Sequence, residues 1–303
     1  MKVIIPGGSG LIGRALAEEL SEAGCPVEIL SRNPERLSGL PKGTVAREWD
    51  SRSPEALAGL ISGSSAVVNL VGENIGASRW TEERKALLRR SRVETTKAVV
   101  EAFRMSEQRP EVLLQASAVG YYGSDRVDEV IEEAPPGADF LGRLCQEWES
   151  ASQEIEVLGV RRVLLRTGLV LSRQGGALPR MALPFRLFVG GPIGSGDQCV
   201  PWIHIADEVG AIRFLIENKD ATGAFNLTAP EIVTNREFSS VLAKTLHRPN
   251  LLPAPAPALK LLLGEMSTLA LDGQCAVPKR LTELGYEFDF SDLQEALHDI
   301  YHR

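Results

Sequence analysis

The first thirteen residues constrain the fold of this chain more than any other stretch. An apolar run, Val3 to Ile5, leads into a cluster of glycines, and a strong helix-forming segment follows at residues 14–20. The glycines satisfy two spacings, Gly7-x-x-Gly10-x-x-Gly13 and Gly8-x-Gly10-x-x-Gly13. In a strand–turn–helix context such glycines permit a tight turn, close approach of a pyrophosphate and helix–strand packing.

A dinucleotide-binding turn is therefore our interpretation, and a glycine-rich turn without a ligand is the alternative. The helix that follows would present free N–H groups and the positive end of its dipole to the phosphates. The cofactor-binding residues expected here are Gly7, Ser9, Gly10, Leu11, Ile12 and Gly13.

Composition narrows the class of protein. The 303 residues are 44% hydrophobic and 24% charged, and the net charge of −7 argues against a nucleic-acid binder with a broad basic surface. Four widely spaced cysteines without a C-x-x-C pattern suggest a reducing compartment and no structural zinc. With no signal peptide expected before the first strand and no apolar run of about 18 residues, we expect a cytoplasmic protein without a membrane span.

The end of the second predicted strand bears on the choice of cofactor. Residues 26–30 read as this strand, and Ser31 and Arg32 follow it where NAD-preferring sites often carry an acidic residue. An arginine suits the 2′-phosphate of NADP(H), although a solvated surface arginine is the alternative. Asp50, after a third strand at residues 45–49, is expected to face the adenine edge.

Two further segments are predicted to reach the carboxyl edge of the sheet. A buried strand at residues 66–72 leads into a loop, which adds Leu70, Val71, Gly72 and Glu73 to the expected cofactor site. A long helix from about residue 81 to 106 carries Arg92, which either belongs to a solvated face or points at the cofactor.

A fifth strand, residues 111–117, ends in a polar loop. Ser117, Tyr121 and Tyr122 make this a candidate catalytic loop. The alternative is that the serine caps the turn and the tyrosines only pack.

These motifs resemble the extended (atypical) short-chain dehydrogenase/reductase superfamily, in its NAD-dependent epimerase/dehydratase group. Closer still, the chain is similar to the epimerase-family proteins sometimes labelled cell-division-inhibitor-like, through VNLVGENI at residues 68–75, SAVGYYG at 117–123, GGPIGSG at 190–196 and PWIHI at 201–205. The resemblance runs from residue 1 to the C-terminus and includes GYEF at residues 285–288. It implies no particular reaction, because this subfamily has no firmly assigned substrate.

The resemblance also exposes a departure from the superfamily. Its working members use a Tyr-x-x-x-Lys pair as acid and base beside the cofactor. In this chain the corresponding positions are Phe140 and Leu144, or Leu141 and Cys145, depending on register. Arg143 is close, but a guanidinium is a poor acid or base near neutral pH.

Three interpretations remain for the chemistry. The proton donor could be Tyr121 or Tyr122, or it could be His204. In the third interpretation no proton is transferred. The alternative for His204 is a purely structural role. Ser117 matches the serine that binds the reacting oxygen in relatives. Residues 161–171 read as a sixth strand. By the same resemblance, Arg166 with Thr167 and Gly168 in this strand would touch the cofactor. The expected substrate contacts are Tyr122, Gln198 and Trp202.

The sequence as a whole predicts an α/β protein with a doubly wound parallel-sheet Rossmann fold and a smaller C-terminal α/β substrate lobe. Residues 1–171, with 197–228, would form the NADP-binding domain, and 172–196 and 229–303 mainly the lobe and closing segment. The leading function is an NADP(H)-dependent oxidoreductase or epimerase-like enzyme for a small polar molecule. The alternative is a non-catalytic NADP(H)-binding regulator or redox sensor that acts through a protein partner. Relatives often dimerise through paired helices, so a homodimer is one option.

Overall fold

A seven-stranded parallel sheet forms the centre of the molecule. A computed structural model describes residues 1–302 of the chain, the side chains of Asp125 and Val127 excepted. The strand order is β10-β7-β5-β4-β1-β2-β3, and every pairing in this sheet is parallel. The strands are β1 (Val3–Pro6), β2 (Val27–Ser31), β3 (Thr44–Glu48), β4 (Ala66–Asn69), β5 (Val112–Ala118), β7 (Arg161–Thr167) and β10 (Gly223–Leu227). The predicted doubly wound α/β fold is confirmed, and the glycine turn after β1 lies where the strand order reverses.

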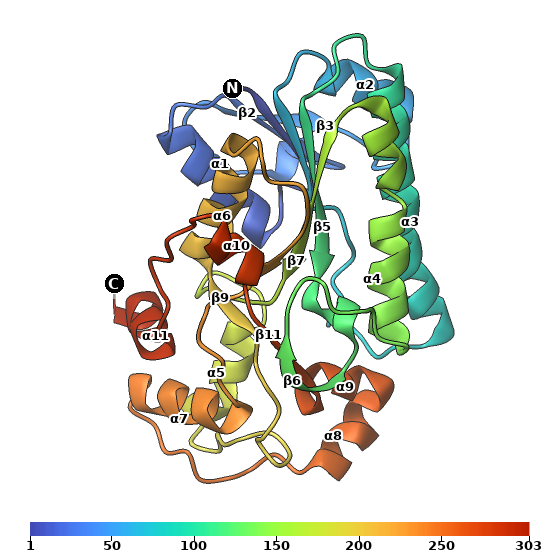
Figure 1. Ribbon diagram of the computed structural model, residues 1–303. Coiled ribbons are helices and arrows are strands. Elements are labelled where there is room, and N and C mark those ends of the chain that lie inside the picture. The colour runs from blue at the N-terminus through green and yellow to red at the C-terminus, as the bar shows by residue number, and fades with distance from the viewer. Residues whose placement is uncertain (303) are drawn as a thin grey trace.

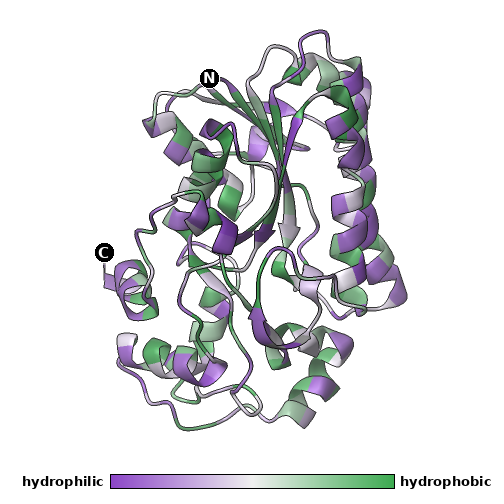
Figure 2. Cartoon of the chain, viewed as in Figure 1, coloured by the Kyte–Doolittle hydropathy of each residue, from purple (hydrophilic) through white to green (hydrophobic). Residues whose placement is uncertain are grey.

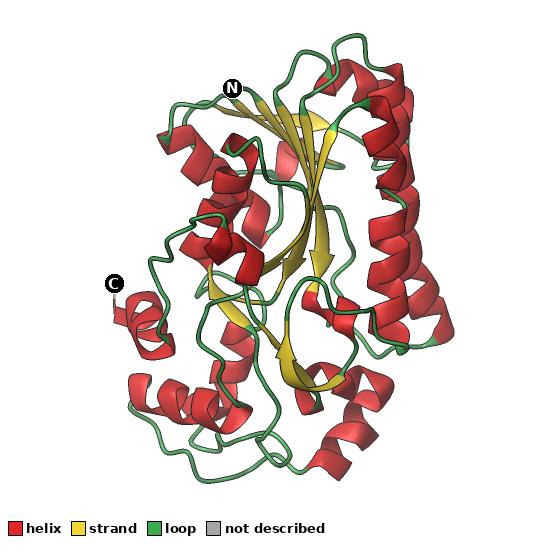
Figure 3. Ribbon diagram, in the orientation of Figure 1, coloured by secondary structure: helices red, strands yellow, loops and turns green. Residues whose placement is uncertain are grey.

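Helices cover both faces of this sheet, as Figures 1 and 3 show. Val3 and Ile5 pack in one core cluster with α1 and α6, whereas Ile4 packs in the opposite cluster with α2 and α3. This alternation within one short strand is the reason that β1 is apolar throughout. Figure 2 accordingly shows hydrophobic residues along the central strands. The covering helices are α1 (Leu11–Glu22), α2 (Pro54–Ile61), α3 (Glu82–Met105), α4 (Phe140–Ser150) and α6 (Ile205–Glu217).

A smaller set of elements lies beyond the carboxyl ends of the strands, toward which β5 and β7 point in Figure 1. Two small parallel pairs belong to this region, β6 (Asp125–Val130) with β11 (Gly273–Ala276) and β8 (Leu169–Leu171) with β9 (Trp202–His204). Its helices are α5 (Leu178–Arg186), α7 (Asn235–Thr245), α8 (Ala256–Leu263) and α9 (Thr268–Leu271), and α10 (Lys279–Glu283) and α11 (Leu293–His302) close the chain. Short 3₁₀ turns complete the inventory at Pro34–Arg36, Val119–Tyr122, Gln153–Leu158 and Gly264–Ser267.

One predicted strand is divided in the structure. Residues 161–171 were expected to form a single strand, but β7 ends at Thr167, and β8 leaves the sheet to pair with β9. The break falls at Gly168, where a Cβ atom would collide with the carbonyl oxygen of Pro201. This prediction was wrong because the close approach of residue 201 is not visible in the local pattern.

Candidate functional site

The glycine turn has the geometry of a phosphate-binding turn. Gly7 has a φ of +76°, and a Cβ on it would lie 2.8 Å from the backbone of Leu70 and Val71. Gly13 packs so closely on Gly8 that a side chain would not fit. A Cβ on Gly10, by contrast, would meet only the Gly7 carbonyl, at 3.6 Å. The turn is thus closed toward the protein and open beside Gly10, at the N-terminus of α1, so the residues present fit a bound pyrophosphate.

The residues at the end of β2 lie near the loop that follows β4. The Arg32 side chain is 68% exposed, and its guanidinium is 3.9 Å from a carboxylate oxygen of Glu73. Ser31 accepts a hydrogen bond from the Asn33 N–H through its hydroxyl. The Trp49 N–H donates to the Ser31 carbonyl, which brings Asp50 next to this strand end. An exposed cation here is free to turn toward a ligand.

Asp50 binds its own turn. Its carboxylate accepts hydrogen bonds from the Arg52 and Ser53 N–H groups and from the Ser53 hydroxyl. The hydroxyl hydrogen bond is the largest reason that the pKa of Asp50 is lowered. Asp50 is therefore a charged residue at this edge whose carboxylate already has local partners.

Arg92 lies in the interior rather than on a solvated face. It is 9% exposed, and its guanidinium donates to the carbonyls of Leu88 and Glu73 and lies over the Trp148 ring. Burial lowers its pKa. Gly72 lies against this guanidinium, since a Cβ on Gly72 would be 3.4 Å from it. Arg92 thus connects the loop after β4 to the helices that cover the sheet.

A buried polar network occupies the carboxyl ends of β5 and β7. Arg166 makes two hydrogen bonds to the carboxylate of Glu149, at 2.8 and 2.9 Å, and a third to the Tyr122 hydroxyl at 3.0 Å. The Ser117 hydroxyl donates to Glu149 at 2.7 Å, and the Tyr122 hydroxyl donates to Asn226 at 2.6 Å. We call these five residues the Arg166 network. It unites three residues predicted to act in catalysis or binding with two, Glu149 and Asn226, that were not in the predicted site.

The electrostatics of the Arg166 network suit a structural role. Burial alone would lower the pKa of Arg166, but its hydrogen bonds and charge pairing with Glu149 raise it instead. Burial raises the pKa of Tyr122 to about 12. Arg166 also lies over the ring of Tyr121, 3.5 Å from its centroid. Both the guanidinium and the phenol therefore hold their protons across the physiological pH range.

A cavity of about 730 Å³ lies beside this network, between the sheet edge and the smaller lobe. Of two consecutive residues at the end of β5, only one faces this cavity. Ala118 lines the cavity, whereas Ser117 is 5% exposed and bonded to Glu149. Since neighbouring strand residues point to opposite faces, Ala118 and not Ser117 faces the cavity.

One face of α4 forms the adjoining wall. Leu141, Leu144, Cys145 and Trp148 all line the cavity. Two registers were considered for the absent Tyr-x-x-x-Lys pair. In the register with Leu141 and Cys145, both residues lie on this cavity-facing side of α4. Burial raises the pKa of the Cys145 thiol to about 12. This face of α4 offers no tyrosine or lysine for proton transfer.

Thr167, which the family resemblance placed beside the cofactor, brings a hydroxyl to the position opposite Ala118. Thr167 is the register partner of Ala118 in the sheet and lines the cavity. Its hydroxyl oxygen is 2.9 Å from a carboxylate oxygen of Glu208, a residue only 1% exposed. Burial raises the pKa of Glu208 to about 8. No motif in the sequence marks this pair, because the two residues meet only across β7 and α6.

Trp202 and His204, like Ser117, Tyr121 and Tyr122, do not line the cavity. Trp202 is completely buried among the residues of the lobe core. His204 accepts the Ala206 N–H at the start of α6, stacks on Phe290 at 4.0 Å and lies 3.5 Å from Asp299. Of the residues predicted for catalysis or substrate binding, Gln198 is the one that lines the cavity, and it donates its amide to the carbonyls of Ile193 and Ala270.

The cysteines differ from the sequence interpretation. Cys199 and Cys275 form a disulfide across 76 residues, with Cα atoms 5.2 Å apart, and Cys199 lines the cavity. Cys25 and Cys145 are free. The pairing was missed because neither cysteine belongs to a local motif, and it weakens the cysteine-based argument for a reducing compartment.

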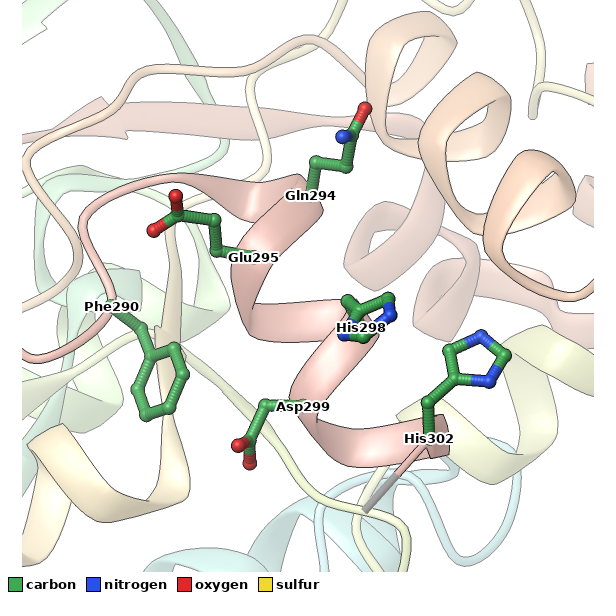
Figure 4. Close-up of a pocket in the computed structure, with 6 residues that line it drawn as sticks. All are labelled: Phe290, Gln294, Glu295, His298, Asp299 and His302. Carbon is green, nitrogen blue, oxygen red and sulfur yellow. The ribbon is translucent and has the colours of Figure 1, made fainter.

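A second pocket, of about 460 Å³, lies on α11 far along the chain from the glycine turn. Figure 4 shows that its polar side chains fan out from the helix and do not converge on one point. Across residues 1–302, moreover, we find no cluster of three or more His, Cys, Asp or Glu residues arranged to bind a metal ion. The same residues contain no helix long and apolar enough to cross a membrane.

Comparison with known proteins supplies the family context. Residues 3–228 match the model of the NAD dependent epimerase/dehydratase family, and residues 254–300 match a domain of unknown function. Epimerase family protein SA0724 of Staphylococcus aureus is 39% identical over 300 residues, 98% of each chain.

Solved structures agree with this match. The human epimerase family protein SDR39U1, solved with NADPH, is 35% identical with a TM-score of 0.88 and covers 100% of this chain and 99% of its own. A UDP-glucose 4-epimerase of Thermotoga maritima has a TM-score of 0.82, covering 100% of this chain and 98% of its own, but is only 17% identical, so it supports the fold alone.

Proposed function

Because the chain belongs to the NAD-dependent epimerase/dehydratase family, we propose that it is an NADP(H)-dependent oxidoreductase that acts on a molecule bound in the cavity beside Ala118. The observation that carries the proposal is the position of this cavity. It begins at the carboxyl ends of β5 and β7, on the edge of the sheet that also carries the glycine turn. Ligands of open α/β folds bind at this edge. When bound, the nicotinamide would supply hydride chemistry.

The residues proposed to hold the cofactor come from four strand ends. The turn at residues 7–13 would bind the pyrophosphate, and Arg32 with Ser31 the 2′-phosphate. Asp50 and residues 70–73 would border the adenosine and ribose groups, with Arg92 behind them. Arg166 leaves the predicted set, because its guanidinium is paired with Glu149. The human relative solved with NADPH supports the choice of cofactor.

Thr167 and Glu208 are our proposed replacement for the missing Tyr-x-x-x-Lys pair. Thr167 offers the hydroxyl that would bind the reacting oxygen of the substrate. Glu208, buried behind it with a pKa near 8, holds a proton at neutral pH that can pass through the threonine hydroxyl. Ser117, Tyr121 and His204 are no longer proposed as catalytic residues.

A second candidate function is a non-catalytic NADP(H)-binding regulator. The apolar face of α4 favours it, since Leu141 and Cys145, one of the two residue pairs that correspond to the acid and its lysine, line the cavity. On either function we keep the division expected from the sequence, a cofactor domain (residues 1–171 with 197–228) and a lobe (mainly 172–196 and 229–303), except that β6, β8 and β9 lie with the lobe. We also propose a cytoplasmic location and a homodimeric assembly.

Hydride tracing separates the two functions. We would incubate the protein with NADPH deuterated at C4 of the nicotinamide and a metabolite extract, and search for deuterated products by mass spectrometry. An oxidoreductase labels a product, and Thr167→Val reduces that labelling without loss of NADPH binding. Because an epimerase returns the hydride to the same carbon, a parallel search would look for a stereoisomer of a deuterated sugar that has kept its deuterium. If the protein bound NADPH tightly but neither search found a labelled product, the result would contradict an enzymatic function and favour a regulatory one.

The cofactor choice has its own test. Arg32→Asp should weaken NADPH binding by at least tenfold and leave NADH binding nearly unchanged, as measured by fluorescence titration. Arg36→Asp, an exposed arginine one turn later, is the matched control. Equal loss of both cofactors would overturn the 2′-phosphate role of Arg32.

A further inference from the structure

We infer that the cavity binds a mainly apolar molecule with a single polar end, rather than a nucleotide sugar. This inference rests on the proposed function for the position of the polar end, beside the nicotinamide site. It departs from the small polar substrate that the sequence suggested.

The wall contributed by the lobe is mainly apolar over three helices, with Arg180 of α5 and Asn235 and Ser239 of α7 as its polar members. Met181 and Phe185 reach the cavity from α5, Phe238 and Leu242 from α7, and Leu259 from α8. The opposite wall is the α4 face described above. A pocket of about 730 Å³ with such walls fits a drug-sized ligand, and most of the surface that the ligand buries would be hydrocarbon.

The charged groups of the cavity are few. Among the described residues that line it, Arg92, Arg180 and Asp272 are the charged ones. Arg92 is occupied by two backbone carbonyls, and Arg180 donates to the Gly76 carbonyl on the sheet side of the cavity. A diphosphate needs several converging cations or N–H donors, whereas both arginines are bonded to carbonyls of the loop at residues 73–76, at the sheet end of the cavity. The lining therefore disfavours a nucleoside diphosphate.

The mouth of the cavity is also apolar. Val189, Leu252 and Leu269 line the cavity, yet 52%, 55% and 43% of their surfaces are exposed to solvent. Helix α8, coloured mainly as hydrophobic in Figure 2, has no buried residue. Exposed apolar groups that rim a cavity are typical of a binding site for an apolar ligand.

The polar end of the ligand is placed by the hydroxyl of Thr167. This group lies at the sheet end of the cavity, opposite the apolar walls of the lobe. A ligand with a carbonyl or hydroxyl at one end and a hydrocarbon body would satisfy both regions at once. We therefore assign the substrate class as apolar carbonyl compounds or the corresponding alcohols.

A homologous series of ligands tests this assignment. We would titrate the protein saturated with NADP⁺, which cannot reduce a ketone, with 2-hexanone, 2-heptanone, 2-octanone and 2-decanone, and separately with UDP-glucose, by calorimetry. We expect Kd to fall about fourfold for each added methylene, because each one buries apolar surface. Binding of UDP-glucose that is tighter than that of 2-decanone, or a Kd that is independent of chain length, would overturn the inference.

Two leucines of α8 provide matched variants that should both fold. Leu259→Asp places a charge on the cavity wall and should weaken 2-decanone binding by at least tenfold. Leu261→Asp makes the same change at a position that is 80% exposed and should have little effect. Equal effects of the two variants would count against the assigned wall.

The failure of this inference is distinguishable from failure of the proposed function. NADPH affinity is measured first and alone, so a protein that binds NADPH but no ketone contradicts only the substrate class. Ketone binding without deuterium transfer supports the substrate class and contradicts the oxidoreductase.

Discussion

Two regions of opposite character meet at the end of β5. On the Ser117 side lies the Arg166 network, in which buried charges and hydroxyls are bonded to one another. On the Ala118 side lies a cavity lined mostly by apolar residues, among which leucine is the most frequent. The comparison teaches that clusters of polar residues in the sequence do not by themselves locate a ligand site. We propose that the Arg166 network stabilises the sheet edge, whereas the mostly apolar lining contacts the ligand.

The largest expected effect comes from breaking the Arg166 network. Arg166→Met should lower the free energy of unfolding by about 3–5 kcal/mol, because it leaves the Glu149 carboxylate buried without its partner. Urea denaturation followed by circular dichroism would measure the loss. The double variant Arg166→Met, Glu149→Leu is the control and should recover most of the stability. A loss below about 1 kcal/mol in the single variant would contradict the structural role of the network.

The second-largest expected effect is the loss of stability on removal of the disulfide beside the cavity. Cys275→Ser should lower the free energy of unfolding by about 2–4 kcal/mol under non-reducing conditions, since the bond restricts a long loop of the unfolded chain. Cys25→Ser, at a free cysteine, is the matched control and should be nearly neutral. A thiol assay on denatured, unreduced protein is expected to find two free thiols. Four free thiols would show that the bond is not formed and would strengthen the argument for a reducing compartment.

Glu208 lies at the boundary of the two regions and should make stability depend on pH. Its pKa is raised from 4.5 to about 8 in the folded state, so between these values the folded chain holds a proton that the unfolded chain has lost. Stability contributed by this group is present below pH 4.5 and falls by up to about 1.4 kcal/mol per pH unit as the pH rises toward 8. Glu208→Gln should reduce this pH dependence of the free energy of unfolding, as measured by urea unfolding at pH 5, 6, 7 and 8. Parallel curves for the two proteins would contradict the buried, protonated carboxyl.

The fold was predictable because its signals are local. The glycine turn after Val3–Pro6, the apolar strands and the Thr81 cap of α3 each depend on a few consecutive residues. The family followed from motifs of five to eight residues for the same reason. The division of residues 161–171 into two strands depended instead on a contact with Pro201, which is distant in the sequence.

The site was less predictable, because its members are brought together by tertiary structure. Ser117 and Ala118 differ by one position, and only the observed pleat decides which of them reaches the cavity. Thr167 meets Glu208 across 41 residues, and Cys199 meets Cys275 across 76. Leucines such as Leu141 and Leu259 have the spacing of ordinary packing residues, and no periodicity separates a cavity wall from a core.

The smallest expected effect sharpens the comparison most directly, because it concerns two adjacent residues. Ser117→Ala removes one hydrogen bond from the Glu149 carboxylate, which keeps its two bonds to Arg166, so stability should fall by only about 1 kcal/mol. NADPH affinity and any deuterium transfer should stay unchanged. Ala118→Ser is the matched variant: it should leave stability nearly unchanged and alter ligand affinity, because its hydroxyl enters the apolar cavity. If Ser117→Ala abolished turnover while stability and NADPH binding were preserved, Ser117 would be a catalytic residue. The assignment of the Arg166 network to structure, and of the Ala118 side to the ligand, would then be wrong.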